Sequence, residues 1–238
     1  DGFFMSNKLI VVTGGSGRFA VSLKKKNISK KCFFPTKKQL NILSVNSIFN
    51  YLKKKKPKYV IHLAGLSRPM SLHDNKIEKS INLNIVGTAN MVISCSKLNI
   101  KLIYFSTSYV YSSTSKTSKE IDPILPKNNY AWSKLGGESS VHMYKNSLIL
   151  RVSMTEKPFV HKEAFKNVMT NFMYHDDVIK LLPKLLDYKG VINVGGKSQS
   201  VFNFVKKSNS KIKAIVAKKN QIPLNSTMNI SKLIKINK

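Results

Sequence analysis

A chain of 238 residues, 42% of them hydrophobic, can bury a core large enough for one domain with a small appendage, and it lacks the run of about 18 apolar residues that a transmembrane helix needs. It carries 41 Lys and Arg residues against 11 Asp and Glu residues, a net charge of +30, yet only Arg18, Arg68 and Arg151 are arginine. Because base reading and bidentate phosphate binding favour arginine, a lysine-rich composition explains the charge better than a specific surface for nucleic acid or membrane does.

Strand-like and helix-like segments alternate along the chain. Apolar runs predict strands at 8–13, 31–34, 59–63, 101–105, 147–152 and 190–194, and helical periodicity is present at 17–26, 45–55, 76–98, 129–144 and 176–187. Strands that alternate with helices form parallel sheets with helices on both faces, so the sequence predicts an α/β fold with a doubly wound parallel sheet. The least regular segments, 111–128 and 154–174, follow strands and are candidate substrate walls.

The stretch after the first predicted strand is TGGSGRFA, residues 13–20. It fits the pattern G-x-G-x-x-A through Gly15, Gly17 and Ala20, and the pattern G-x-x-G-x-x-A when Gly14 replaces Gly15. A dinucleotide site needs a tight turn, close approach of backbone N–H groups to the pyrophosphate and a helix N-terminus facing it. We interpret the stretch as a nucleotide-binding turn, with an ordinary glycine turn as the alternative.

The residues that follow this turn bear on the choice between NAD and NADP. Sites that prefer NAD place an Asp or Glu about 20 residues after the glycine motif, to bind the ribose 2′-hydroxyl. No acidic residue lies between Gly2 and His73. A 2′-phosphate could be accepted instead by Thr36, Lys37, Lys38 and Arg18. The sequence therefore predicts a preference for NADP, with NAD possible, and the lysine-rich composition is the alternative explanation for the missing acids.

Six short motifs occur in a fixed order: TGGSGRFA (13–20), HLAG (62–65), NIVGT (84–88), STSYVY (106–111), YAWSK (130–134) and LRVS (150–153). From about residue 7 to 195 the chain resembles the extended short-chain dehydrogenase/reductase family of nucleotide-sugar epimerases, dehydratases and reductases. A later stretch, IPLNSTMNISKL (222–233), looks like the closing segment of dTDP-4-dehydrorhamnose reductases. The resemblance implies a Rossmann-like NAD(P)-binding domain over 5–153. It implies a reduced substrate-binding lobe over 154–238, interleaved with the last strands of the sheet.

The resemblance implies three catalytic residues. Tyr130 would be the acid/base, Lys134 its partner one helical turn away, and Thr107 the hydroxyl that holds the reacting oxygen. A neighbouring ammonium and an oxidised nicotinamide ring favour the phenolate, so we expect the tyrosine pKa to lie below its usual value near ~10. In isolation, such a tyrosine and lysine are more often surface neighbours, and such a threonine more often satisfies a turn. Ser108 and Tyr109 stand where sugar dehydratases carry Asp-Glu, which disfavours a 4,6-dehydratase.

The resemblance also implies residues beside the cofactor, which form the glycine turn and the adenine, ribose and nicotinamide walls: Gly14, Gly15, Gly17, Arg18, Phe19, Thr36, Asn41, Ile42, Leu63, Ala64, Gly65, Ser106, Lys134 and Ser153. We expect Asn84 to brace the central helix. Arg151 is either an ion-pair partner at the sheet edge or part of the nicotinamide wall. Asp176 and Asp177 are expected to cap the helix that follows them.

The remaining polar residues predict no metal site. The five histidines, at positions 62, 73, 142, 161 and 175, are not spaced as metal ligands, and no cysteine lies near them. Cys32 and Cys95 lie in apolar segments and form no framework of pairs, which suits a reducing, cytoplasmic location.

The main hypothesis is an NADP-dependent reductase or epimerase of a nucleotide-linked sugar, and the resemblance implies a homodimer. Only about 22 residues separate Ser153 from Asp176, fewer than the reductases that the chain resembles carry there. The alternative is therefore a non-catalytic NAD(P)-binding regulatory subunit with the same fold. Binding of nucleic acid by the basic surface ranks below both.

Overall fold

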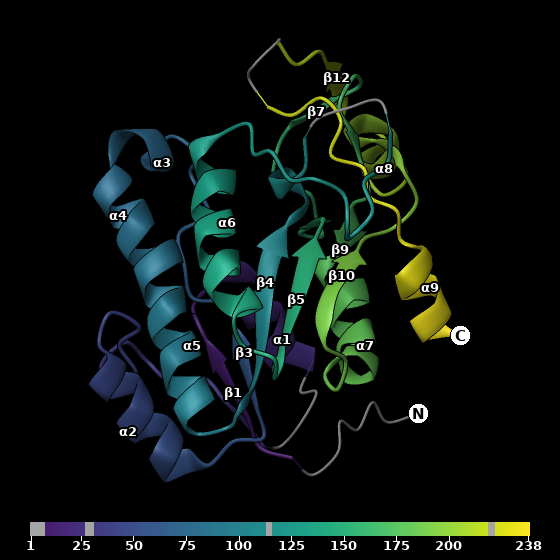
Figure 1. Ribbon diagram of the computed structural model, residues 1–238. Coiled ribbons are helices and arrows are strands. Elements are labelled where there is room, and N and C mark those ends of the chain that lie inside the picture. Colours follow the sequence, from purple (N-terminus) through teal and green to yellow (C-terminus); the bar gives the residue numbers. More distant parts are fainter. Residues whose placement is uncertain (1–7, 27–30, 113–115, 219–221) are drawn as a thin grey trace.

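A computed structural model describes residues 8–26, 31–112, 116–218 and 222–238 (Figure 1). Residues 5–7 of the predicted first domain and 113–115 of the predicted substrate wall lie outside the described residues. Within the described part, one six-stranded parallel sheet has the order β10-β5-β4-β3-β1-β2. Its strands are β1 (Ile10–Thr13), β2 (Cys32–Phe33), β3 (Tyr59–His62), β4 (Lys101–Thr107), β5 (Ser147–Val152) and β10 (Gly190–Val194). The predicted α/β fold with a doubly wound parallel sheet is confirmed.

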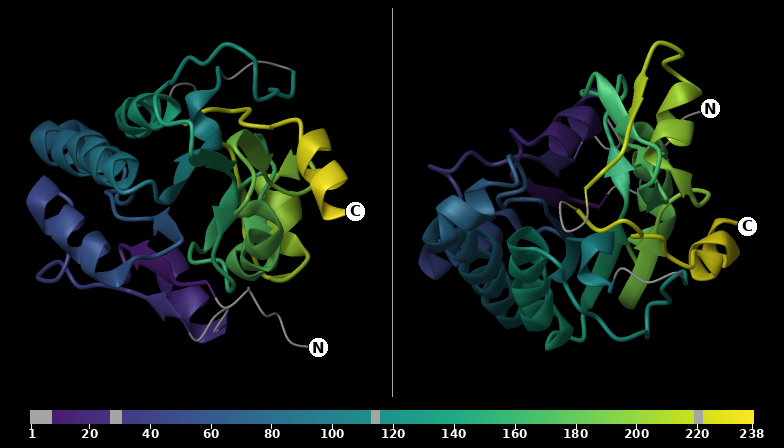
Figure 2. Two further views of the ribbon diagram at one scale, coloured as in Figure 1. Left: turned by 60° about the horizontal axis from the view of Figure 1, so that its bottom comes forward. Right: turned by 90° about the horizontal axis from the view of Figure 1, so that it is seen from above.

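Helices cover both faces of this sheet (Figures 1 and 2). One face carries α1 (Arg18–Lys26) and α7 (His175–Leu185), and the other carries α2 (Val45–Lys55), α5 (Gly87–Lys97) and α6 (Asn129–His142). Side chains alternate between the two layers along β1, where Ile10 and Val12 pack on the α1 side and Val11 on the α2 side. Both faces of the strand are buried, which explains its uninterrupted apolar run.

The strand order reverses between β1 and β3. From β1 the chain runs to β2 on one side, then crosses to β3, β4, β5 and β10 on the other. In open α/β sheets the crevice at such a reversal, outside the carboxyl ends of the strands, is where ligands bind. A ligand site is therefore expected at the residues just after β1, β3, β4 and β5.

The predicted helix over 76–98 is present from 77 to 97 and contains a π-helical segment. It consists of α4 (Ile77–Ile81), the π-helical segment η1 (Asn82–Val86) and α5, and a separate short helix, α3 (Leu72–Asn75), precedes it. Apolar residues recur every four residues through the π-turn, so the periodicity did not indicate it. Another short helix, η2 (Ser108–Val110), follows β4.

A small lobe lies beyond the carboxyl ends of the sheet (Figure 1). The predicted irregular segment 154–174 contains β6 (Met154–Thr155), β7 (Glu163–Phe165), β8 (Met169–Thr170) and β9 (Met173–Tyr174), and β6 pairs with β9. Later residues supply β11 (Gln199–Ser200), which pairs with β8, and β12 (Lys213–Ile215), which pairs with β7. The helix α8 (Val201–Lys206) completes this lobe, whereas α9 (Ser231–Asn237) packs against α7 and β10 beside the main sheet. Between these segments the chain returns to the main sheet as β10, and the predicted division into two domains at 153 stays a prediction.

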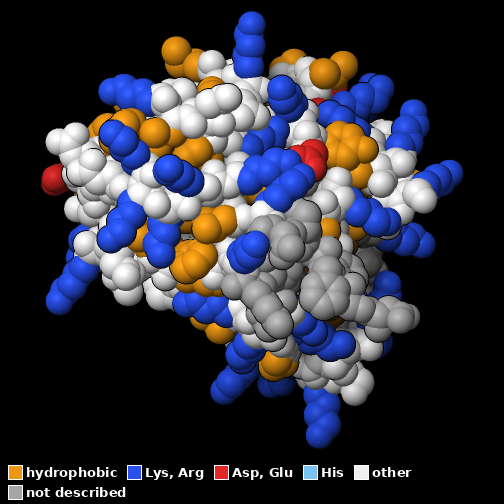
Figure 3. Space-filling model, turned by 90° about the horizontal axis from the view of Figure 1, so that it is seen from below, with side chains coloured by type: hydrophobic (Ala, Val, Ile, Leu, Met, Phe, Trp, Pro, Cys, Tyr) orange, Lys and Arg blue, Asp and Glu red, His pale blue; other side chains and the backbone are white. Residues whose placement is uncertain are grey.

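The surface matches the composition. Lysine and arginine side chains are scattered over the face seen in Figure 3 and do not gather in one patch. Among the described residues, no helix is both long and apolar enough to cross a membrane.

Candidate active site

The glycine turn after β1 packs against the end of β3. Gly14 has φ +70°, and a Cβ there would lie 2.7 Å from the backbone nitrogen of Ala64. The N–H of Gly17 donates to the Gly14 carbonyl at 2.9 Å, which closes the turn before α1 begins. The structure thus brings Gly14, Leu63 and Ala64, all predicted cofactor residues, to one point, and only glycine fits at position 14.

Replacing Gly14 with alanine should both destabilise the fold and abolish dinucleotide binding. Gly190 provides a matched control, since its φ is +79° but a Cβ there meets nothing within 4 Å. We expect Gly190→Ala to cost about 1–2 kcal/mol of unfolding free energy from strain alone. Gly14→Ala should cost about 1–3 kcal/mol more because of the clash. Urea unfolding and cofactor titration of both variants measure this, and equal costs would contradict the close approach.

A buried chain of hydrogen bonds joins this turn to the central helix. The Thr13 hydroxyl accepts from the N–H groups of Leu63 and Ala64 and bonds the His62 Nδ1 at 2.8 Å. On the other side of the ring, Nε2 lies 3.2 Å from the Thr88 hydroxyl, which donates to the Asn84 carbonyl. Burial lowers the pKa of His62 to about 3, with help from the charge of Lys134, so the ring is neutral. His62 is therefore a structural residue.

Asn84 braces the site from the π-helical segment η1, as predicted. Its side chain accepts from the Leu66 N–H at 2.7 Å and donates to the Leu66 carbonyl and to the Ser133 hydroxyl. It also lies against Gly65, where a Cβ would come within 2.7 Å of its amide oxygen. One side chain thus holds the loop after β3 against α6. A Cβ on Gly137 of α6 would collide with the Asn84 carbonyl, so α6 also packs directly on η1.

Tyr130 and Thr107 meet at the carboxyl end of β4. The Thr107 side chain lies close enough to Tyr130 to act on its pKa, and it accepts from the Tyr109 N–H at 3.2 Å. The Tyr130 ring packs edge-to-face against His73, with centroids 5.1 Å apart, and against Tyr109 at 6.3 Å. Thr107 therefore both caps η2 and contacts the predicted acid/base. His73 was not predicted here, because it lies far away in the sequence and in no recognised motif.

Lys134 lies one turn further along α6, over an aromatic ring. Its Nζ is 4.2 Å from the centroid of the Tyr104 ring, and the Tyr104 hydroxyl donates to the Lys134 carbonyl at 2.9 Å. Burial lowers the pKa of Lys134 to about 7, and the charge of Glu138 acts in the opposite direction. The amine is thus close to half-protonated at neutral pH.

The expected lowering of the tyrosine pKa depends on an oxidised nicotinamide ring and stays a prediction, whereas burial within the protein acts in the opposite direction. Burial raises the pKa of Tyr130 to about 12, and the hydrogen bond with Thr107 and the charge of Arg68 only partly oppose it. A lysine with a pKa of about 7 carries at most part of a charge at neutral pH, so it cannot hold the phenolate. Tyr130 is a protonated phenol at pH 7, which suits a proton donor.

A buried ion pair between Glu138 and Arg151 connects α6 to β5. The Glu138 carboxylate, fully buried, accepts from Arg151 Nη2 at 2.6 Å, from Arg151 Nε at 3.1 Å and from the Ser106 hydroxyl at 2.5 Å. Arg151 also donates to the Tyr111 hydroxyl at 2.7 Å, and that hydroxyl donates to the Asn193 side chain on β10. Arg151 is thus an ion-pair partner. Glu138 was missed, although it continues the spacing of Tyr130 and Lys134 by another four residues.

Some predicted cofactor residues have their side chains engaged elsewhere. The Phe19 ring packs in the core against Phe105 at 5.1 Å, and Ser106 donates to Glu138, so contacts of these two with a cofactor would involve the backbone. The Ser153 hydroxyl bonds Thr170 at 2.8 Å, and its N–H donates to the Val194 carbonyl.

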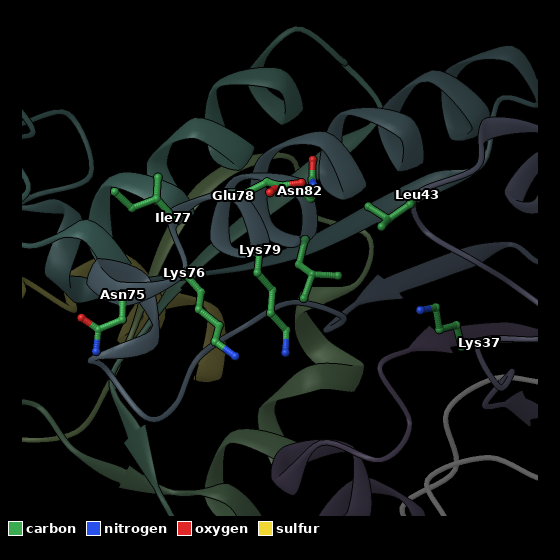
Figure 4. A pocket seen from close by; sticks show the side chains of 9 residues that line it. Lys37, Leu43, Asn75, Lys76, Ile77, Glu78, Lys79 and Asn82 are labelled. Atoms are coloured by element: carbon green, nitrogen blue, oxygen red, sulfur yellow. The ribbon is translucent and has the colours of Figure 1, made fainter.

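The residues after β2 form the other end of the crevice. The Thr36 hydroxyl donates to Gln39, the Asn41 side chain accepts from the Leu43 N–H, and Ile42 is buried against Gly87. Beside them lies a cavity of about 650 Å³, lined by Lys37, Leu43, Asn75, Lys76, Ile77, Glu78, Lys79, Asn82 and Leu83 (Figure 4). Lys24 of α1 adds a further cation that the motifs did not indicate. Its Nζ lies 4.8 Å from the Phe34 ring centroid and within 3.3 Å of where a Cβ on Gly15 would be.

The carboxylates at the start of α7 do not cap it with their side chains. The N-cap is Tyr174, and Asp176 and Asp177 lie in the first turn, where they form exposed ion pairs with Lys26 at 2.9 Å and Lys180 at 3.6 Å. The expectation of side-chain caps is wrong, although negative charge in the first turn still suits the helix dipole.

Solved structures with low sequence identity to this chain have the same fold. The structure of dTDP-4-dehydrorhamnose reductase from Bacillus anthracis in complex with NADP superposes with a TM-score of 0.85 at 20% identity, covering 96% of this chain and 92% of that one. The Bordetella bronchiseptica enzyme WbmG in complex with NAD and UDP superposes with a TM-score of 0.78 at 18% identity, covering 97% and 87%.

Curated relatives found by sequence match a shorter part of this chain than the solved structures do. Methionine adenosyltransferase 2 subunit beta from Pongo abelii is 27% identical over 144 residues, which are 57% of this chain and 43% of that protein. GDP-6-deoxy-D-talose 4-dehydrogenase from Aggregatibacter actinomycetemcomitans is 30% identical over 145 residues, which are 57% and 48%. The matched region thus spans less than half the length of each relative. The family profile described as RmlD substrate binding domain matches residues 7–183, most of the chain. With its glycine turn, its Tyr-Lys helix and its parallel sheet, this chain belongs to the RmlD substrate binding domain family of extended short-chain dehydrogenases/reductases.

Proposed function

We propose that the protein is an NADP-dependent oxidoreductase or epimerase of a nucleotide-linked sugar, most like a dTDP-4-dehydrorhamnose reductase. The observation that carries the proposal is the meeting of Thr107 and Tyr130 at the carboxyl end of β4, with Lys134 on the same side of α6. The glycine turn fits a dinucleotide, because Gly14 leaves a cradle that a Cβ would fill. The NADP complex of one similar structure and the NAD and UDP complex of another support this class of ligands.

The chemistry follows from the state of each residue. A bound nicotinamide supplies the hydride. Tyr130, with a pKa of about 12, is protonated at neutral pH and donates its phenolic proton to the oxygen of the carbonyl being reduced. Thr107 holds that oxygen beside the phenol. Lys134, with a pKa of about 7, returns a proton to Tyr130 and binds the nicotinamide ribose.

Turnover of a keto sugar tests the proposal. NADPH oxidation should be followed with nucleotide 4-keto-sugars that carry dTDP, GDP or UDP. We expect oxidation with at least one of them and none with the matching 4-hydroxy sugar under the same conditions. Saturable NADPH binding without oxidation across the set would count against the proposal.

The second candidate is a non-catalytic NAD(P)-binding regulatory subunit. The similarity over 144 residues to methionine adenosyltransferase 2 subunit beta favours it, as does the small lobe beyond the sheet. It predicts cofactor binding that is unchanged in Tyr130→Phe and no turnover in either protein. The assay of NADPH oxidation on the unaltered protein therefore distinguishes the two candidates.

Cofactor preference should depend on Lys24. We expect NADPH to bind more tightly than NADH, because Lys24, Lys37 and Lys38 lie near the end of β2 and its following loop, where a 2′-phosphate would lie. Lys24→Gln should weaken NADPH binding by about 10- to 100-fold and change NADH binding less than twofold, since a hydrogen bond to a charged group is worth ~1.5–3 kcal/mol. Lys25→Gln, on the exposed side of the same helix, is the control. Tighter NADH than NADPH binding in the unaltered protein would contradict the preference.

A further inference from the structure

Two of the three arginines converge on one carboxylate just beyond the carboxyl ends of the sheet. Arg18 Nη1 lies 2.6 Å from Glu156 Oε1, and Arg68 Nη1 lies 3.3 Å from Oε1 and 3.5 Å from Oε2. Arg18 is the first residue of α1 after the glycine turn, Arg68 is in the loop after β3, and Glu156 follows β6. Three segments that each follow a sheet strand thus meet around a single anion.

The Glu156 carboxylate is largely buried, whereas the guanidinium groups of Arg18 and Arg68 are partly exposed to solvent. The Glu156 side chain is 16% exposed, against 49% for Arg18 and 37% for Arg68. The Thr155 hydroxyl donates to Glu156 Oε2 at 3.3 Å. Burial would raise the pKa of Glu156, but the hydrogen bond from Arg18, that from its own N–H and the charges of both arginines outweigh it and hold the pKa at about 2. The carboxylate is therefore ionised at neutral pH and pairs with both arginines as an anion.

Arg68 is near enough to the proposed reaction site for its charge to act on two tyrosines there. Burial raises the pKa of Tyr130 and that of Tyr109, and the positive charge of Arg68 opposes this rise in both. The arginine pair therefore extends from the glycine turn to the phenol proposed as the proton donor. Arginine is the residue best suited to bind phosphate oxygens in pairs, because its planar fork matches them.

We propose that Arg18 and Arg68 form a pyrophosphate subsite, and that Glu156 occupies it as an internal anion which a nucleotide ligand displaces. The nature of the ligand rests on the proposed function, whereas the competition between Glu156 and a phosphate does not. The pyrophosphate has two possible sources, the dinucleotide cofactor and the nucleotide sugar. Because the carboxylate competes with the ligand, its removal should strengthen binding, which is the reverse of what loss of an ordinary binding residue does.

Calorimetric titration of the whole chain with inorganic pyrophosphate, UDP and NADPH tests the competition. In Glu156→Gln we expect pyrophosphate to bind about 3- to 10-fold more tightly, the size of effect that a partly exposed ion pair has when it no longer competes. In Arg68→Gln we expect binding about 10-fold weaker. A gain confined to NADPH places the subsite on the cofactor, and a gain confined to UDP places it on the nucleotide sugar.

Asp187→Asn is the control for net charge. It removes one negative charge from the ion pair with Lys58, at the opposite end of the sheet, and should leave all three affinities within twofold. Affinities in Glu156→Gln that are unchanged or weaker, in a protein whose circular dichroism is that of the wild type, would overturn the proposal and leave the cluster as a structural tie. A protein that shows the predicted gain for pyrophosphate yet turns over no keto sugar would refute the proposed function and keep the subsite.

Discussion

Replacing Tyr130 with phenylalanine should lower kcat for the keto-sugar reaction by about 10²- to 10⁴-fold, the range that a positioned general acid contributes. Phenylalanine keeps the ring contacts with His73 at 5.1 Å and Tyr109 at 6.3 Å, so the local packing should persist. Only the hydroxyl that bonds Thr107 is lost. NADPH affinity should therefore stay within about threefold while turnover disappears.

The matched control for this substitution is Tyr188→Phe. Tyr188 is 43% exposed and follows α7 at the end of the sheet opposite the site, so its hydroxyl has no part in the proposed chemistry. Single-turnover measurements on both variants separate the chemical step from binding and release. A Tyr130→Phe protein with more than a tenth of the wild-type rate would remove the tyrosine from the mechanism.

Replacing Arg151 with methionine should cost about 3–5 kcal/mol of unfolding free energy, the range for breaking a buried ion pair from one side. The Glu138 carboxylate would remain fully buried without its arginine partner, and its remaining contacts would be the Ser106 hydroxyl and the His142 ring at 3.4 Å. Methionine approximates the volume of the arginine stem, so the loss would reflect charge more than packing. Urea unfolding at neutral pH gives the value.

Two comparisons isolate the charge in this prediction. The double substitution Glu138→Leu with Arg151→Met removes both charges and should recover most of the loss, since apolar pairs often replace buried ion pairs at little cost. Asp176→Asn, which breaks an exposed pair with Lys26 at 2.9 Å, should cost less than ~1 kcal/mol. If Arg151→Met lowers the free energy of unfolding no more than Asp176→Asn does, the buried ion pair contributes no more to stability than an exposed one.

Low pH should reduce the difference between wild type and Arg151→Met. Burial alone would raise the pKa of Glu138, but hydrogen bonds from His142 and Arg151 and the charge of Arg151 hold it at about 2, below its ordinary 4.5. A depressed carboxyl pKa stabilises the fold above the unfolded-state value, and this contribution is lost as the pH falls from about 4.5 towards 2. The wild-type advantage should narrow over this interval.

The sheet and the glycine turn could be predicted because they depend on local patterns. Apolar runs such as 8–13 and 147–152 marked strands buried on both faces, and the structure places strands there. The order of the six motifs identified the family, and with it Thr107, Tyr130 and Lys134 as neighbours. The homodimer and the cytoplasmic location stay predictions.

The features that were missed depend on contacts between distant residues. Glu138 and Arg151 are 13 residues apart, and Arg18 and Glu156 are 138 apart, so no spacing rule joins them. The effect of burial on the pKa of Tyr130, which outweighs that of the neighbouring charges, was not predicted because burial depends on the complete fold. The π-turn at Asn82–Val86 preserves the apolar spacing and is invisible to periodicity.

The glycine contact between α6 and the π-turn determines which parts of the molecule can move during a reaction cycle. With no side chain at Gly137 between the two backbones, and with Asn84 bonded to both Leu66 and Ser133, the helix that carries Tyr130 cannot slide or rotate without breaking several contacts at once. Tyr130, the proposed proton donor, therefore keeps its position relative to the sheet. Opening and closing around a ligand must come from the segments beyond β5, whose short strands each form only two or three residue pairs.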